Sequence, residues 1–270
     1  MRIYTNVAAI NAHRNLFLND VAMGKTMEKL SSGLRVNRAA DDAAGLAISE
    51  KMRAQINGYN QALRNAQDGV SLLQTAEGAM TEIHAMLQRM VTLATQSANG
   101  TYDNTTDRNA LQAEVNQLIA QIDQIAGSTN FNGINLLNST TSIQLQIGAN
   151  VADTLTFSLA NATSTALGLG SLSIATQSAA NAAITTLRNA INLVSSARAR
   201  FGAVQNRLEH TINNLGVTAE NLSASESRIR DADMAYEMTQ FIRNQILVQA
   251  GTAMLAQANA VPQNVLRLLG

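Results

Sequence analysis

One apolar stripe, repeated every three or four residues, constrains this chain more than any other feature. It runs from Ile48 to Ala94 and covers 46 residues in 13 steps, about 3.5 residues per step. That period is typical of a coiled-coil seam. The stripe comprises Ile48, Met52, Ile56, Tyr59, Leu63, Ala66, Val70, Leu73, Ala76, Met80, Ile83, Leu87, Met90 and Ala94. A helix of this length is roughly 70 Å long, so the pattern predicts an elongated molecule.

Two further helical stripes follow the first. A shorter one starts after Thr106-Asp107, which can cap a helix, and ends at Gly127. A second long one spans residues 184–215 and continues past Ile229 into the C-terminal end. Because two long stripes can bury each other when they run antiparallel, we expect a mainly α, elongated antiparallel long-helix coiled-coil bundle.

Between the helical stripes the period changes from about 3.5 to two. Apolar residues alternate with polar ones over 143–147 and again over 155–159, and Gly148-Ala149-Asn150 lies between the two runs. This predicts a small β-hairpin at 143–159 with one buried face. Asn132-Gly133 marks an earlier turn, and residues 160–178 are expected to be loop.

The two chain ends are apolar and predict partners for each other. Residues 245–270 carry a single charge, Arg267. Residues 1–34 carry a narrow apolar stripe that Ser31-Ser32-Gly33 interrupts, and it comprises Ile3, Val7, Ile10, Phe17, Val21, Met27, Leu30 and Leu34. Chain ends are usually polar unless something ties them down. We therefore expect paired termini at one end of the bundle. The predicted domains are a terminal domain, 1–45 plus 230–270, and a rod domain, 46–229.

Composition argues against nucleic-acid, membrane and small-molecule binding and against catalysis. Lys+Arg and Asp+Glu balance at 19 each, which disfavours nucleic acid and membrane partners. Aromatic residues make up 3% and cysteine is absent. The three histidines are far apart, and no phosphate loop or nucleophile motif appears, so we expect no enzyme, no cofactor and no metal. The N-terminus does not look like a classical secretory signal, so export would use another route.

Three long motifs resemble those of bacterial flagellin. They are LSSGLRVNRAADDAAGLAIS at residues 30–49, NFNGINLL at 130–137 and AMLAQANAVPQNVL at 253–266. The resemblance covers about residues 1–159 and 184–270, and because the gap between them is short we expect the variable outer domains of larger flagellins to be missing. It implies a structural subunit that self-assembles into the extracellular flagellar filament for swimming motility.

The resemblance also implies residues and partners. The terminal core that drives self-assembly would contain Ile3, Val7, Ile10, Ile246, Leu247, Met254, Leu255, Val265 and Leu266. Residues 31–45 resemble the spoke that connects the terminal core to the rod. Implied partners are copies of the chain itself, an export chaperone at the C-terminal segment, the flagellar type III export apparatus, and junction and cap proteins.

The family is also sensed by Toll-like receptor 5, and residues 88–96 lie where that receptor's epitope lies. Arg89, Leu93 and Glu114 match its recognised positions, whereas Val91 and Thr92 replace an Arg and a Glu common in detected flagellins. For Arg89 and Glu114 an ordinary solvated or subunit-contact role is an equal alternative.

Two alternative functions differ from this one in what the sequence should contain. A hook–filament junction protein shares the terminal pattern, although the full C-terminal motif favours a filament subunit. An enzyme or a receptor-binding module would instead need a deep pocket with converging polar groups.

Overall fold

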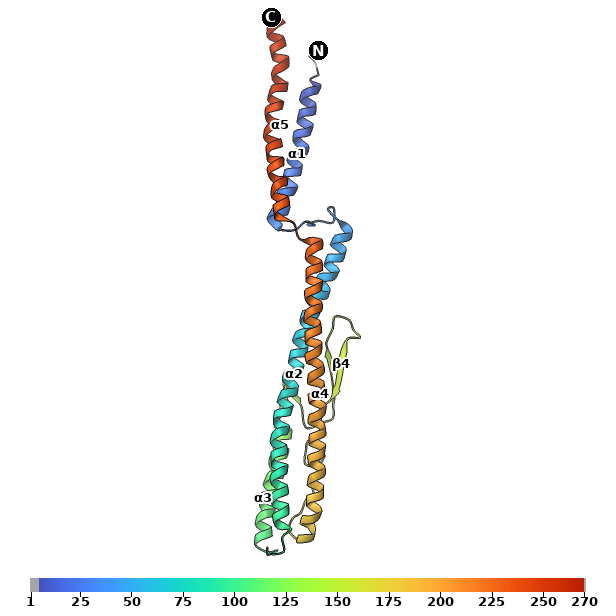
Figure 1. The fold of residues 1–270 in the computed structure, drawn as a ribbon, viewed down its shortest axis with the longest axis vertical. Helices are drawn as coiled ribbons and strands as arrows, with labels where there is room; N and C mark the ends of the chain where they lie inside the picture. The colour runs from blue at the N-terminus through green and yellow to red at the C-terminus, as the bar shows by residue number, and fades with distance from the viewer. Residues whose placement is uncertain (1–4, 270) are drawn as a thin grey trace. The chain divides into compact units, whose positions relative to one another are not determined.

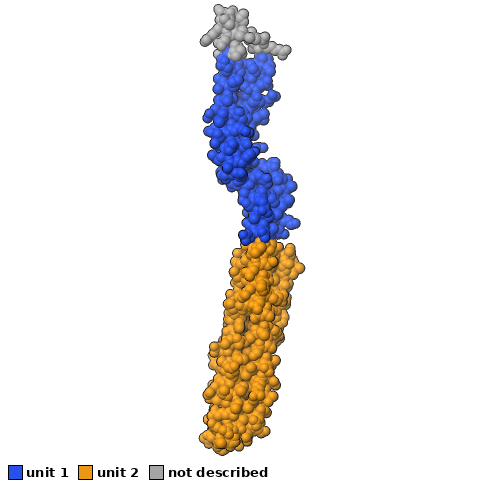
Figure 2. All heavy atoms as spheres, viewed as in Figure 1, with its two compact units in different colours: residues 1–56, 220–270 blue, residues 57–219 orange. Residues whose placement is uncertain are grey.

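The computed structural model describes the backbone of residues 5–269 and the side chains of residues 5–260. These residues form two compact units (Figure 2). One unit contains residues 1–56 and 220–270, and the other contains residues 57–219. Two long helices, α2 (Ala43–Ser97) and α4 (Gln177–Arg230), contribute to both units.

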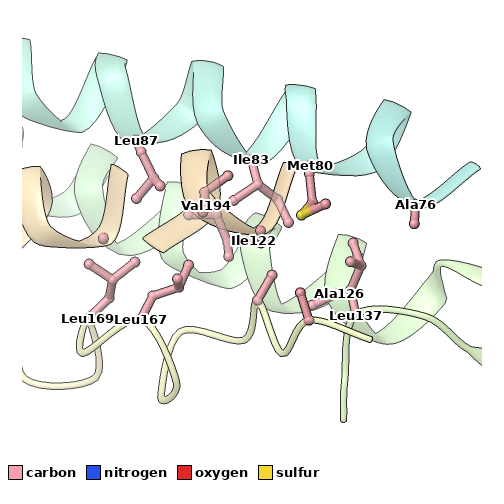
Figure 3. Packing of buried hydrophobic residues seen from close by; sticks show 14 of the residues in the cluster. Ala76, Met80, Ile83, Leu87, Ile122, Ala126, Leu137, Leu167, Leu169 and Val194 are labelled. Carbon is pink, nitrogen blue, oxygen red and sulfur yellow. The ribbon is translucent and has the colours of Figure 1, made fainter. Parts of the chain in front are cut away.

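The unit of residues 57–219 is built on a core shared by α2, α4 and the shorter helix α3 (Asp107–Ser128). The predicted stripes supply this core, as Figure 3 shows for Met80, Ile83 and Leu87 of α2 facing Ile122 of α3 and Val194 of α4. The bundle of long packed helices is therefore confirmed. The first residue of the stripe departs from the pattern, because Ile48 remains 48% exposed.

A buried arginine closes the end of α2. Arg108 is 5% exposed, and its Nε donates to the carbonyl of Ser97 at 2.8 Å while its Nη2 donates to the carbonyl of Asn99 at 2.8 Å. The last carbonyls of a helix have no partner within the helix. The guanidinium supplies such a partner to Ser97 and a further one to Asn99 in the turn that follows, and the Asn104 side chain accepts a hydrogen bond from its Nη1.

The start of α3 differs from the prediction. The side chain of Thr106 makes no capping hydrogen bond. The carboxylate of Asp103 accepts from the backbone N–H groups of Thr105 and Thr106 instead. These hydrogen bonds hold the pKa of Asp103 below its ordinary value, with the Thr105 hydroxyl as the largest cause.

Two small antiparallel strand pairs connect α3 to α4. Strands β1 (Asn130–Phe131) and β2 (Ile134–Asn135) flank the predicted Asn132-Gly133 turn, where both residues have positive φ angles of 49° and 79°. Such angles define the type I′ turn that suits a two-residue hairpin. Strands β3 (Ser142–Gln146) and β4 (Thr154–Ser158) confirm the predicted hairpin. Leu155 and Phe157 of β4 are buried, as the alternating pattern requires.

The other unit contains the terminal helices α1 (Val7–Ser32) and α5 (Met234–Leu269), which pack against each other (Figure 1). Each is joined to a long helix by a short non-helical segment, and these two segments are hydrogen-bonded together. The Arg35 N–H donates to the carbonyl of Arg230 at 2.7 Å, and the Ala232 N–H donates to that of Gly33 at 2.9 Å.

The helical pattern was predicted to continue from Ile229 into the C-terminal end, and that expectation is wrong. The chain leaves the helix at Asp231–Asp233, where Leu34 and Asp231 form an isolated bridge. The carboxylate of Asp233 then accepts from the N–H groups of Ala235 and Tyr236, which starts α5 as an N-cap. A capping aspartate was the signal that marked this break.

Candidate assembly interface

The two terminal helices run antiparallel with one continuous register. The Asn6 side chain donates to the carbonyl of Ala258 at 2.8 Å, and Lys29 lies 3.2 Å from Glu237. Between these points Leu16 lies so close to Gly251 that an added Cβ would come within 3.1 Å of its Cδ1. The register therefore holds from the start of α1 to its last turn.

The face that α1 turns to α5 is not the predicted stripe. Its half-buried positions are Ala9, Ala12, Leu16, Asn19, Met23, Thr26 and Leu30, at helical steps of three and four. Of the stripe predicted over residues 1–34, Leu30 lies on this contact face, whereas the others that the structure describes on α1 lie on the neighbouring face and stay exposed: Val7, Ile10, Phe17, Val21 and Met27. Small residues such as Ala9 and Ala12 allow two helices to approach closely, but they contribute little to a hydrophobic pattern in the sequence. The larger residues of the stripe therefore do not mark the face that contacts α5.

Helix α5 shows the same division into two faces. Phe241, Val248, Gly251, Leu255 and Ala258 are half-buried at helical spacing and form the face toward α1. Ile246, Leu247 and Met254 are 58%, 42% and 64% exposed. Of the residues predicted for the self-assembly core, Leu255 thus lies within the helix pair, while these three face outward.

The side chains of three residues predicted for the self-assembly core lie outside the described part of the structure. Ile3 lies outside the described residues, and Val265 and Leu266 belong to α5 but their side chains lie outside the described part. Val7 and Ile10 are described, and they are 54% and 58% exposed. From Val7 to Ser32 no residue of α1 is fully buried.

Many large apolar side chains of this helix pair stay exposed. Contiguous apolar patches on a protein surface mark sites where another molecule binds. On α1 and α5 the large exposed apolar residues are Val7, Ile10, Phe17, Leu18, Val21, Met27, Met234, Tyr236, Met238, Ile242, Ile246, Leu247 and Met254. We call this set the terminal apolar surface.

Polar interactions fix the base of the helix pair. The side chain of Glu237 is 7% exposed and is paired with Lys29, which is 29% exposed. A buried ion pair adds little net stability but opposes wrong registers, because a shifted helix would leave a buried charge alone. The carboxylate of Asp41 accepts hydrogen bonds from the backbone N–H groups of Arg38 and Asn37. These hold the pKa of Asp41 below its ordinary value, with the Arg38 bond as the largest cause.

The residues predicted as a receptor epitope lie in the other unit. Arg89 and Glu114 form an exposed ion pair, with Arg89 Nη2 2.8 Å from Glu114 Oε1. Leu93 is 1% exposed and belongs to the hydrophobic core. The structure therefore brings Arg89 and Glu114 together on the surface and places Leu93 inside.

The described residues contain neither a cluster of metal-ligating side chains nor a membrane-spanning helix. Over that part of the chain, His, Asp and Glu do not gather in groups of three or more that could hold a metal ion. None of the helices in the described range is both long and apolar enough to cross a membrane.

The sequence matches two family descriptions. Residues 3–142 match the bacterial flagellin N-terminal helical region, and residues 184–269 match the bacterial flagellin C-terminal helical region. Among solved structures, the crystal structure of Bacillus cereus flagellin is similar with a TM-score of 0.52 and 39% identity, covering 60% of this chain and 94% of that one. A putative flagellar hook-associated protein from Vibrio parahaemolyticus has a TM-score of 0.59 at 11% identity, which shows a shared fold alone.

Full-length relatives agree with these matches. The chain is 53% identical over 272 residues to a flagellin of Halalkalibacterium halodurans and 50% identical over 303 residues to a flagellin of Bacillus subtilis. Both alignments cover 100% of this chain and 100% of the relative. The chain belongs to the bacterial flagellin family.

Proposed function

We propose that this flagellin polymerises into the flagellar filament by burying its terminal apolar surface against the same surface on neighbouring copies. Its membership of the flagellin family makes it a structural subunit of that filament. The observation that carries the proposal is the outward apolar face of α1 and α5, exemplified by Ile10 at 58% and Met254 at 64% exposure.

The geometry suits repeated packing between copies. The inner faces of α1 and α5 are used within the chain, so each copy presents the outer faces already aligned. Pre-organised helices lose little further conformational freedom when they associate. The C-terminal part of α5 is also poor in charge, since it carries only Arg267 after Arg243, and a buried unpaired charge would oppose assembly.

The two proposed domains would have different positions in the filament. Residues 1–45 with 230–270 would form the core of the filament, and residues 46–229 would form the layer outside it. The role is structural and includes no catalytic step. The junction-protein alternative gains no support, because the full-length relatives reported above are flagellins and the hook-associated likeness is one of fold.

Further partners come from the family resemblance. We propose export through the flagellar type III apparatus, with a chaperone covering residues 245–270 before export, and contacts with junction and cap proteins at the filament ends. An apolar C-terminal helix that exposes Ile246 and Met254 supports the chaperone, since such a surface aggregates when left uncovered.

Recognition by Toll-like receptor 5 would centre on the Arg89–Glu114 ion pair, the exposed part of the predicted epitope. Leu93 would support that surface from beneath. In a receptor reporter assay the Arg89→Ala variant should signal less strongly than the unsubstituted protein. Equal signalling would remove these residues from the epitope.

Deletion of residues 245–270 tests the polymerisation role. The full chain, seeded and sedimented, should pellet as filaments, whereas the truncated chain should stay in the supernatant as a soluble monomer with its 57–219 core intact. A truncated chain that polymerises as well as the full chain would refute the role of α5.

A further inference from the structure

The turn between β3 and β4 presents a valine to solvent. Val151 is 94% exposed, more than any other large apolar residue among the described side chains. Hairpin turns usually carry Gly, Asn, Asp or Ser, which meet the backbone requirements of the turn. A side chain so exposed adds almost nothing to the stability of its own chain, and it is free to contact another molecule.

The turn that carries Val151 is held in one conformation. The carboxylate of Asp153 accepts from the N–H of Asn150 at 3.1 Å and from its side-chain amide at 3.0 Å. Gln146 spans the turn by donating to the carbonyls of Gly148 and Asn150 at 3.0 Å and 2.6 Å. A loop fixed in advance loses little entropy on binding, which favours its use as a contact.

A cavity of about 440 Å³ opens on the same unit. Met80 of α2, Leu167 of the 160–176 loop and Val194 of α4 form part of its apolar lining, and Figure 3 shows all three among the packed side chains of the core. Leu193 and Arg200 also line it. Leu193 is 52% exposed, and Arg200 is exposed and enters no ion pair with the residues that the structure describes.

The turn and the cavity cannot meet within one chain. Ala149 of the turn lies beside Gly58 of α2, where an added Cβ would come within 3.0 Å of its side chain, and Met80 of α2 lines the cavity. The 22 residues between Gly58 and Met80 correspond to about 33 Å along the helix. Any contact between the two surfaces therefore joins different copies.

We propose that the β3–β4 turn of one copy inserts Val151 into this cavity on a second copy, with Asp153 facing Arg200. The inference rests on the proposed function, since it assumes neighbouring copies in a filament. Charge supports the match, because Asp153 is the only charged residue from Gly127 to Leu187 and the cavity offers Arg200, which has no ion-pair partner among the described residues. A contact between two different surfaces repeats from copy to copy and generates an open helical series.

Disulfide trapping tests the contact, and the chain is free of cysteine. Filaments of the double variant Val151→Cys/Leu193→Cys, once oxidised, should give a ladder of covalent oligomers on a non-reducing gel. The monomeric double variant should give none, because the two sites are too far apart to bridge within one chain. The matched pair Val151→Cys/Ile134→Cys uses a 45% exposed site outside the cavity lining and should give no ladder.

Well-formed filaments of the double variant without a ladder would overturn the proposal. Failure of the unsubstituted protein to form filaments would instead refute the proposed function. A second measurement needs no cysteine: Val151→Ala should raise the critical concentration for polymerisation roughly tenfold, since two methyl groups no longer become buried. Its thermal unfolding midpoint as a monomer should not change, and an unaltered critical concentration would contradict the contact.

Discussion

Replacement of Ile246 by serine should weaken polymerisation by an amount that follows from its exposure. Ile246 is 58% exposed on α5, so its share of the fold of the monomer is small. Complete burial of an isoleucine side chain contributes about 1.5–3 kcal/mol. Burial of the remaining 58% would then contribute about 0.9–1.7 kcal/mol per subunit, which is a factor of roughly 4–20 in the critical concentration.

Serine suits this test because it and isoleucine have similar intrinsic helix propensities, so α5 should form equally well in both proteins. The critical concentration is read from sedimentation of seeded protein over a concentration series. Gln245→Ser is the matched control, since it changes an exposed polar neighbour on the same helix and should shift the critical concentration little. An unchanged value for Ile246→Ser, or equal shifts in both variants, would refute the reasoning.

Three further predictions concern the folded chain. Arg108→Met should lower the free energy of unfolding by about 2–3 kcal/mol, because the carbonyls of Ser97 and Asn99 lose charged donors. Thermal denaturation followed by circular dichroism measures this change. Unaltered stability would show that water replaces the guanidinium. Gly33→Ala should cost about 1 kcal/mol or more in the same assay, since Gly33 ends α1 with a φ of 71° that alanine adopts only under strain; an equal or higher midpoint would contradict that assignment. The Arg230 hydrogen bond holds the pKa of Glu50 below its ordinary value of 4.5, so the stabilisation that the ionised carboxylate gives the folded chain is present above pH 4.5 and is lost as the pH falls through the lowered pKa. Glu50→Gln should therefore lose less thermal stability than the unsubstituted chain when the pH is lowered from about 6 to about 3. An equal loss in both proteins would exclude the Glu50–Arg230 pair as a source of acid sensitivity.

The helices of the 57–219 unit were predictable because their signals are long and local. The period of the α2 stripe needs no knowledge of its partner, and Ser97 ends the helix where the apolar pattern gives way to Ala98-Asn99-Gly100. The β3–β4 hairpin was equally clear, since alternation over two short runs fixes both the strands and their buried face.

The terminal unit was harder to predict because its packing uses small residues. Alanines at 9 and 12 form the contact face of α1, whereas the larger Val7 and Ile10 that dominate the sequence pattern face outward. A stripe shows that a face will be buried, but not whether the partner belongs to the same chain. The burial of Arg108 was not predicted, because a charged residue in a sequence is expected at the surface unless the helix end that it caps is known.

The central claim is that the terminal apolar surface is where neighbouring subunits meet. A helical reconstruction by electron cryo-microscopy of filaments grown from the purified chain tests it most directly. We expect Val7 and Ile10 of α1 and Ile246 and Met254 of α5, all exposed in the monomer, to be buried against terminal helices of neighbouring copies. Filaments in which these side chains still face solvent would contradict the claim.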